Sequence, residues 1–203
     1  NNIDMSATDL SQIPISEIEK IEIIYGSGNV LYGDNATAGV INIVTKKVDK
    51  SLFEINTKFN TFLTMDINAT FAQVLKENFG LKLNVHNSNF NGFRENNSYT
   101  ANDINLSINT KIISDTEIGF RTDFHKDSYG LPGSVEEIDY LNNNIRVSNT
   151  PPDSAATLYS INSQLSTSKK FDDSKSANVE YNYKTSLIES NWPSFGVFAF
   201  YDT

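Results

Sequence analysis

The 203-residue sequence has no cysteine, only 5 prolines and 1 tryptophan, and few basic residues. Without cysteine the chain has neither a disulfide framework nor a thiolate metal site. No apolar run approaches the roughly 18 residues that a membrane-spanning helix needs. Sixteen lysines and arginines stand against 25 aspartates and glutamates, which gives a formal net charge of −9. This charge argues against nucleic-acid binding, because that function requires a basic surface.

Aromatic residues are the abundant class, with 13 phenylalanines and 9 tyrosines. They suit β-strands and the aromatic girdles of membrane barrels. A chain without spanning helices can cross a membrane as a β-barrel, because barrel strands alternate apolar and polar residues and contain no long apolar stretch. Composition alone fits equally well an acidic, asparagine-rich soluble β domain.

The most informative segment is residues 13–47. It contains, in order, a strand-like run (Ile21–Tyr25), Gly26 and Gly28, a Leu31-Tyr32-Gly33 corner, and a second strand-like run (Gly39–Val44) that Lys46 and Lys47 close. Glycines at such corners supply backbone angles that a side chain disfavours and allow close approach of neighbouring backbone. The segment is therefore expected to form two strands joined by a glycine-rich connection.

This order of pieces closely resembles the end of the plug domain in TonB-dependent outer-membrane receptors. The match covers about 35 residues with several fixed spacings. Two later segments, Phe90–Tyr99 and Gly130–Ser134, resemble loop segments of the same family. The sequence departs from the family pattern where Lys20 and Tyr25 replace arginines, Ser27 a proline and Ala38 a glycine.

From residue 51 onward, apolar and polar residues alternate with a period of two, which is typical of strands with one apolar and one polar face. Seven strands are expected, and an eighth begins near Phe195. One face is expected to carry Phe53, Ile55, Phe59, Ile67, Phe71, Leu83, Val85, Leu106, Ile108, Ile118, Phe120, Phe124, Ile161, Val179, Tyr181 and Tyr183. The other is expected to carry Glu54, Asn56, Lys58, Asp66, Asn68, Lys82, Asn84, Asn105, Lys111, Arg121, Asp123, Gln164 and Glu180.

The connections between these strands alternate in length. Short turns are expected at 76–78, 114–115 and 170–175, and longer links at 87–98 and 126–156, with a moderate one near 190–194. Outer-membrane barrels sort periplasmic turns from extracellular loops in this way. The link 61–64 is an exception, because it is short where a long loop is expected.

The resemblance implies an all-β fold that forms part of a plugged transmembrane antiparallel β-barrel. Residues 1–47 correspond to the C-terminal part of the plug domain, and residues 51–203 to seven or eight N-terminal barrel strands. Barrels of about 22 strands are the plugged class. We expect the chain to be an internal piece of a longer precursor whose signal sequence and TonB box lie outside it.

As a member of this family, the protein is expected to lie in the outer membrane of a Gram-negative bacterium and to import a metal chelate such as an iron–siderophore complex. The implied partners are the TonB complex, the small-molecule ligand and outer-membrane lipid. Candidate ligand-binding residues near the external loops are Arg94, Tyr99, His125 and Tyr129. Glu22, with Lys20, is expected to hold the plug against basic groups of the barrel wall such as Lys58, Lys82 or Arg121. The alternative function is a soluble antiparallel β-sheet module for binding or adhesion.

Catalytic motifs are not found in the sequence. It contains neither a GxSxG elbow nor a phosphate-binding loop after Gly26-Ser27-Gly28. His86 and His125 are expected on the polar face, in strands that a third strand separates, and a shared metal would need Asp123 or Asp127 as a further ligand. Water-bonded or plug-bonded polar residues are the simpler interpretation, so no catalytic residue, metal site or cofactor is assigned. Ligand identity is left open between siderophore, haem, cobalamin, nickel chelate and oligosaccharide.

Overall fold

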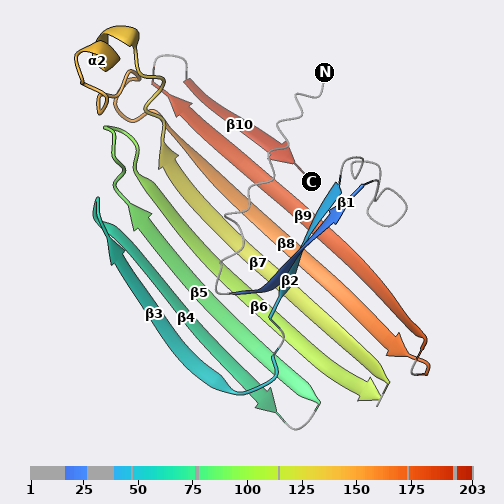
Figure 1. Ribbon diagram of the computed structural model, residues 1–203. Helices are drawn as coiled ribbons and strands as arrows, with labels where there is room; N and C mark the ends of the chain where they lie inside the picture. Colours follow the sequence, from blue (N-terminus) through green and yellow to red (C-terminus); the bar gives the residue numbers. More distant parts are fainter. Residues whose placement is uncertain are drawn as a thin grey trace. The chain divides into compact units, whose positions relative to one another are not determined.

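The computed structural model describes residues 17–26, 39–46, 48–75, 78–113, 115–172, 174–193 and 196–202. The chain divides into two compact units, residues 1–47 and 48–203, and each is described by itself (Figure 1). Within the described residues, no helix has both the length and the apolar character that crossing a membrane would require.

The first unit contains an antiparallel pair of strands, β1 (Ile18–Tyr25) and β2 (Gly39–Thr45). Both strand-like runs of the opening segment are strands, although β1 begins three residues before the expected Ile21. A Cβ atom at Gly39 would lie 2.8 Å from the carbonyl oxygen of Ile24, so this position tolerates only glycine without a shift of the backbone. Gly28 and the Leu31-Tyr32-Gly33 corner lie outside the described residues.

The second unit is a single antiparallel sheet in which each strand pairs with its neighbours in sequence. The curved sheet in Figure 1 runs from β3 at one edge to β10 at the other. Its eight strands are β3 (Leu52–Asn60), β4 (Thr64–Leu75), β5 (Phe79–Phe90), β6 (Tyr99–Ile113), β7 (Thr116–Gly130), β8 (Ala155–Lys170), β9 (Ser176–Trp192) and β10 (Gly196–Asp202). The period of two predicted seven of these strands and the start of an eighth.

Several strands are longer than the alternation predicts. β5 runs to Phe90, β7 to Gly130, and β8 begins at Ala155, so residues 87–90 and 126–130 belong to strands rather than to the expected loops. Both faces become polar at this end, and the apolar–polar alternation therefore fades. The backbone ladder continues because its hydrogen bonds do not depend on side-chain polarity.

Connections lie at two ends of the sheet because consecutive strands are antiparallel. One end holds the β4–β5, β6–β7 and β8–β9 turns. The other, which we call the loop end, holds the longer links at 91–98 and 131–154 together with the β3–β4 turn. The 131–154 link includes a five-residue helix, α2 (Glu137–Leu141), whose side chains are not buried. Gly133 in this link has a φ of 69°, the left-handed conformation that glycine accommodates in a turn.

Burial in this sheet is the reverse of that in a soluble protein. The face that carries Asn84 and Asn105, which we call the inner face, buries these amides to 0% and 1% exposure. On the opposite, outer face, Phe53 and Tyr181 are 71% and 66% exposed. The register explains this separation, because residues directly opposite each other share a face: Phe53, Phe71, Leu83 and Leu106 lie in one row, and Glu54, Thr70, Asn84 and Asn105 in the next. The two faces are therefore occupied as the sequence predicts.

Candidate functional site

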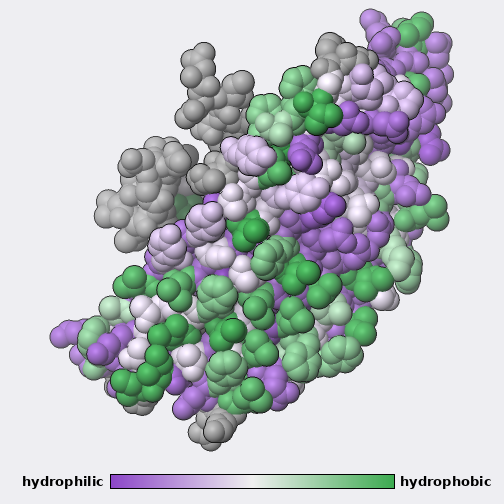
Figure 2. Space-filling model, turned by 180° about the vertical axis from the view of Figure 1, so that it is seen from behind, coloured by the Kyte–Doolittle hydropathy of each residue, from purple (hydrophilic) through white to green (hydrophobic). Residues whose placement is uncertain are grey.

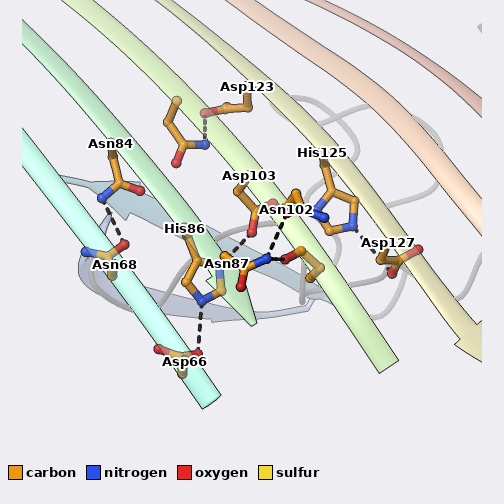
Figure 3. A network of polar contacts seen from close by, with 12 residues as sticks. Asp66, Asn68, Asn84, His86, Asn87, Asn102, Asp103, Asp123, His125 and Asp127 are labelled. Carbon is orange, nitrogen blue, oxygen red and sulfur yellow. Dashed lines mark hydrogen bonds and ion pairs between the residues drawn. The ribbon is translucent and has the colours of Figure 1, made fainter. Parts of the chain in front are cut away.

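The inner face of the second unit carries a chain of alternating carboxylate and imidazole groups. Its register places His86, Asp103 and His125 directly opposite one another on β5, β6 and β7. Asp66 on β4 and Asp127 on β7 complete the chain at its two ends, and Figure 3 shows all five side chains gathered over four neighbouring strands. Both histidines of the sequence belong to this cluster, which we call the His–Asp chain.

The distances define a continuous path of contacts through the His–Asp chain. Nε2 of His86 lies 3.0 Å from Oδ2 of Asp66, and its Nδ1 lies 2.7 Å from Oδ2 of Asp103. The other oxygen of Asp103 lies 2.5 Å from Nδ1 of His125, whose Nε2 is 3.4 Å from Oδ2 of Asp127. Asp103 thus bridges the two rings, and the side chains of Asp103 and His125 are each 1% exposed.

The donor and acceptor chemistry of this cluster has a consequence for its charge. An ionised carboxylate only accepts hydrogen bonds, whereas a neutral imidazole donates from a single nitrogen. A carboxylate oxygen faces both ring nitrogens of His86 and of His125. His86 has hydrogen bonds at both nitrogens and can donate on both sides only as imidazolium. His125 has a hydrogen bond at Nδ1 and only a longer contact of 3.4 Å with Asp127 at Nε2. Charge-assisted bonds of this kind are the stronger ones in proteins.

Amide and guanidinium groups continue the polar network along the inner face. The side-chain nitrogen of Asn84 donates to Oδ1 of Asn68 at 2.9 Å and to Oγ1 of Thr70 at 2.8 Å. Asn105 donates to Oδ1 of Asp123 at 2.7 Å, and Arg121 binds both oxygens of the same carboxylate at 2.9 and 2.7 Å. These contacts join neighbouring strands and fix the rotamers of the face. Asp123, which the sequence suggested as a partner of the histidines, is instead paired with Asn105 and Arg121.

The two long links of the loop end are held together by Arg94. Its Nη1 donates to the carbonyl oxygen of Gly133 at 2.5 Å, and its Nη2 donates to that of Val147 at 2.8 Å and that of Pro132 at 3.3 Å. One guanidinium thus binds three carbonyls of the 131–154 link. Asn96 adds bonds from the same 91–98 link to the carbonyls of Leu131 and Ser154.

An aromatic cluster joins the short β3–β4 turn to the same assembly. The ring of Phe62 packs edge-on against those of Phe90 and Phe93, at centroid distances of 6.4 and 5.7 Å. The guanidinium of Arg146 lies over Phe93 at 5.1 Å and donates to the Phe93 carbonyl. Phe62 adopts a φ of 58°, which is uncommon for a residue with a side chain. The β3–β4 turn and the 91–98 and 131–154 links therefore form one packed group.

Of the four candidate ligand-binding residues, the structure brings two together. Tyr99 and Tyr129 lie directly opposite each other on β6 and β7, on the inner face beside the loop end. Phe90 lies opposite Tyr99, which extends the aromatic row to β5. His125 is four residues below Tyr129 on β7 and belongs to the His–Asp chain, and Arg94 lies in the 91–98 link. A ligand-binding role for these four residues stays a prediction.

In the first unit, Glu22 is paired within its own sheet. Its Oε1 lies 2.6 Å from Nζ of Lys20, and its Oε2 accepts a hydrogen bond from Asn42 on β2 at 2.8 Å. The hydrogen bond from Lys20 lowers the pKa of Glu22, and the bond from Asn42 lowers it further. The same contact raises the pKa of Lys20. Whether Glu22 also meets a basic group of the second unit stays a prediction.

The described residues contain no group of three or more histidine, cysteine or acidic side chains arranged to hold a metal ion. In the His–Asp chain, these groups contact one another instead. Sequence reasoning identified His86, His125 and Asp127 but missed the central carboxylate of Asp103. The signal that could have found it is parity, because Asp103 lies two residues before Asn105 and hence on the same face.

Comparison with known proteins finds one matching family description and several related transporters. Residues 1–40 match the family described as the TonB-dependent receptor plug domain. The vitamin B12 transporter BtuB of Photobacterium profundum is 25% identical over 153 residues, which cover 68% of this chain and 25% of that protein. BtuB of Vibrio vulnificus is 46% identical over 41 residues, 20% of this chain and 7% of that protein. The chain thus spans a quarter or less of the length of these relatives.

Solved structures share the fold. The unliganded ferric citrate transporter FecA superposes with a TM-score of 0.74 at 16% identity, over 88% of this chain and 28% of that one. BauA, the ferric preacinetobactin receptor of Acinetobacter baumannii, gives a TM-score of 0.71 at 14% identity, over 87% of this chain and 28% of that one. At such identities the likeness concerns the fold, which is that of a plugged antiparallel β-barrel.

Proposed function

The chain belongs to the family of TonB-dependent receptors, whose members are transporters and receptors rather than enzymes, and from this premise we propose that it forms part of an active importer. The importer lies in the bacterial outer membrane and takes up a metal chelate such as an iron–siderophore complex. Energy comes from the inner-membrane TonB complex. The observation that carries the proposal is the reversed burial of the second unit, which buries inner-face polar residues such as Asn84, Asp103 and His125 while the aromatic residues of its outer face are exposed.

This burial fits a sheet that separates lipid from a polar lumen. Apolar side chains on the outer face of β3–β10 would remain in contact with acyl chains, whereas carboxylates and lysines of the inner face would meet water or plug. Under the alternative function, a soluble binding or adhesion module, Phe53, Ile55 and Phe59 would be exposed to water on a contiguous surface. We therefore place residues 51–203 in the barrel wall and residues 1–47 in the plug.

Ligand capture is assigned to the loop end of the inner face. Tyr99 and Tyr129 form an aromatic row there, and the links tied by Arg94 stand beside it. The related proteins named above are a vitamin B12 transporter, a ferric citrate transporter and a ferric preacinetobactin receptor, and these three ligands are metal-containing small molecules. Tyrosine hydroxyls can donate hydrogen bonds to oxygen atoms that such chelates present, which supports this ligand class.

The plug contact is assigned to Glu22. Its carboxylate is only partly covered by Lys20 and Asn42, since 42% of the side chain is exposed within the described residues. Of the three cations expected to meet this group, Lys58 is exposed on the inner face, whereas Lys82 is 5% exposed and Arg121 already binds Asp123. Reversing the charge by Glu22→Lys is expected to make the outer membrane leaky to large antibiotics, and Glu22→Gln to do so less.

Growth tests the proposed import directly. A strain lacking the intact receptor gene is supplied with single iron, cobalt or nickel chelates as the only source of that metal. We expect growth to fail on one chelate and to return with the wild-type gene. A parallel fractionation asks whether the protein needs detergent for extraction from the membrane. Extraction without detergent would support the soluble module. Normal growth of the deletion strain on every chelate would contradict the proposed ligand class but not the membrane location.

A further inference from the structure

The outer face of the sheet carries very few charges. By register, the outward positions of β3–β10 within the described residues include three charged side chains, Lys126, Lys169 and Glu189. Figure 2 views the sheet from the side opposite to Figure 1 and shows hydrophobic residues gathered over a broad area, with hydrophilic residues toward the loops. A cation on such a face is costly at the middle of a bilayer, so its position along the strand matters.

Lys126 lies at the boundary between the apolar and polar parts of this face. The row below it toward the turns is mainly apolar and includes Val85, Ile104, Phe124, Ile161 and Thr185. From β4 to β10, its own row contains Ile67, Asn87, Asn102, Lys126, Tyr159, Leu187 and Tyr201. Asparagine, lysine and tyrosine next to an apolar band are typical of the interface between acyl chains and headgroups.

A groove follows these two rows across five strands. It has a volume of about 470 Å³, and its lining includes Ile104, Phe124, Ile161 and Leu187 with Asn102 and Lys126 at its polar side. Nζ of Lys126 lies 5.2 Å from the centroid of the Tyr159 ring, and Lys126 is exposed. The lysine is thus held by an aromatic face rather than by a carboxylate among the described residues, and its N–H groups are available to a ligand anion.

We propose that this groove binds one outer-leaflet lipid whose headgroup carries phosphate. The phosphate accepts hydrogen bonds from Lys126 and Asn102, while acyl chains lie along Ile104, Phe124 and Ile161. The inference rests on the proposed function, since it requires the outer face to stand in a membrane with its loop end outside the cell. Two observations select this occupant: the groove continues the exposed apolar face, and the cation at its headgroup side complements an anion.

The geometry favours a phosphate over a zwitterionic headgroup because the row offers donors without an acidic neighbour. Lys126 and Asn102 are directly opposite each other on β7 and β6. Glu189, the acidic outward residue, is on β9 and opposite Thr157 rather than Tyr159. An ammonium near a membrane surface contributes about 1 kcal/mol per lysine to the binding of anionic lipid, which corresponds to roughly five-fold in affinity.

Native mass spectrometry of the intact detergent-extracted receptor tests the proposal. The probe is bis-phosphorylated lipid A, and the reference ligand is the same lipid after removal of its phosphates. We expect the phosphorylated lipid to bind one copy more tightly than the reference. Lys126→Gln should lower its affinity about five-fold and leave binding of the reference unchanged. Lys169→Gln is the matched control, because Lys169 is also an outward lysine over an aromatic ring, that of Phe171, but at the opposite end of the sheet.

Equal loss of binding in the two lysine variants would show general attraction to the basic protein and overturn the specific site. Equal binding of the phosphorylated and dephosphorylated lipid would do the same. Replacing Ile104 by Asn provides a second variant, which should weaken both lipids because it alters the acyl part of the groove. If the receptor inserts into the membrane but fails these tests, only the proposed lipid site is wrong. If the protein does not insert into the membrane, the proposed function is wrong as well.

Discussion

Oδ1 of Asp103 lies 2.5 Å from Nδ1 of His125 on the neighbouring strand, and only 1% of either side chain is exposed. The second oxygen of Asp103 binds His86 on the other side. One carboxylate on β6 therefore connects β5 to β7 through side chains, in addition to the backbone ladders. Such a connection is expected to stiffen the barrel wall where the inner face is most strongly charged.

Asp103→Asn is predicted to destabilise the protein by about 3–5 kcal/mol, because it removes the buried carboxylate that His86 and His125 share. The measurement is the thermal unfolding midpoint of the intact detergent-solubilised receptor, followed by circular dichroism. Asp115→Asn in the exposed β6–β7 turn is the matched control and should shift stability by less than about 0.5 kcal/mol. If the two variants unfold at the same temperature, the His–Asp chain does not support the wall.

Arg94→Ala is predicted to loosen the 131–154 link, because three carbonyls lose their shared donor. A glutamate-specific protease should then cleave at Glu136 or Glu137 about ten-fold faster, since local opening exposes the backbone. Arg146→Ala is the comparator. This side chain donates to one carbonyl and covers Phe93, so its effect should be smaller. Arg94→Lys should lie between wild type and Arg94→Ala, because an ammonium lacks the fork of the guanidinium.

Unchanged cleavage in Arg94→Ala would mean that the packed aromatic cluster alone holds the links. In that case Arg94 would be available for the ligand, as its place in the loop suggested from sequence. The two roles are separable by measurement: a ligand contact changes affinity for the chelate without changing proteolysis, whereas a positioning role changes proteolysis of the unliganded protein.

Much of the fold follows from short-range pattern. In residues 52–60 the alternation of Phe53 and Ile55 with Glu54 and Asn56 was sufficient to predict the strand and both faces. This worked because side-chain direction in a strand has a period of two whatever the strand pairs with. The opening segment predicted β1 and β2 in the same way, since apolar runs and flanking glycines are local features.

The parts that were missed depend on long-range register. Asp103 is separated from His86 and His125 by 17 and 22 residues, and only the alignment of three strands shows that it bridges them. The ends of β5 and β7 were misplaced for a different reason. Near Asn87 and Lys126 both faces are polar, so hydrophobicity no longer marks a strand that backbone hydrogen bonds continue. The Arg94 contacts likewise join residues 38 to 53 positions apart in the sequence.

The Lys20–Glu22 pair predicts a pH dependence of the first unit. The pKa of Glu22 is lowered by the Lys20 hydrogen bond, so the pair stabilises the fold above the unfolded pKa of the carboxylate. That contribution is lost as the pH falls through the lower, folded pKa. At the basic end, the raised pKa of Lys20 means that the contribution is lost as the pH rises through it.

Lys20→Met should therefore raise the pKa of Glu22, as measured by titration of carbon-13-labelled glutamate side chains in the intact receptor by NMR. Lys46→Met, in the same unit, is the control and should leave the Glu22 signal where it is in wild type. A Glu22 pKa that does not respond to Lys20→Met would show that Asn42, or a group outside this unit, dominates the carboxylate's environment.

The sharpest test of the barrel assignment uses two adjacent residues of β6. Ile108 lies on the outer face opposite Phe120 of β7, and Asn109 lies on the inner face opposite Gly80 of β5 and Gly119 of β7. Ile108→Arg places a cation against lipid, which costs about 2–4 kcal/mol near the bilayer middle. Asn109→Arg points to the polar inner face, where a charge can be hydrated or paired. We expect Ile108→Arg to reduce the amount of receptor in the outer membrane, and Asn109→Arg to reach wild-type levels by immunoblot of membrane fractions.

A one-residue error of register would exchange the two results. Equal insertion of both variants would show that the outer face does not meet lipid, and the importer would then lose its physical basis.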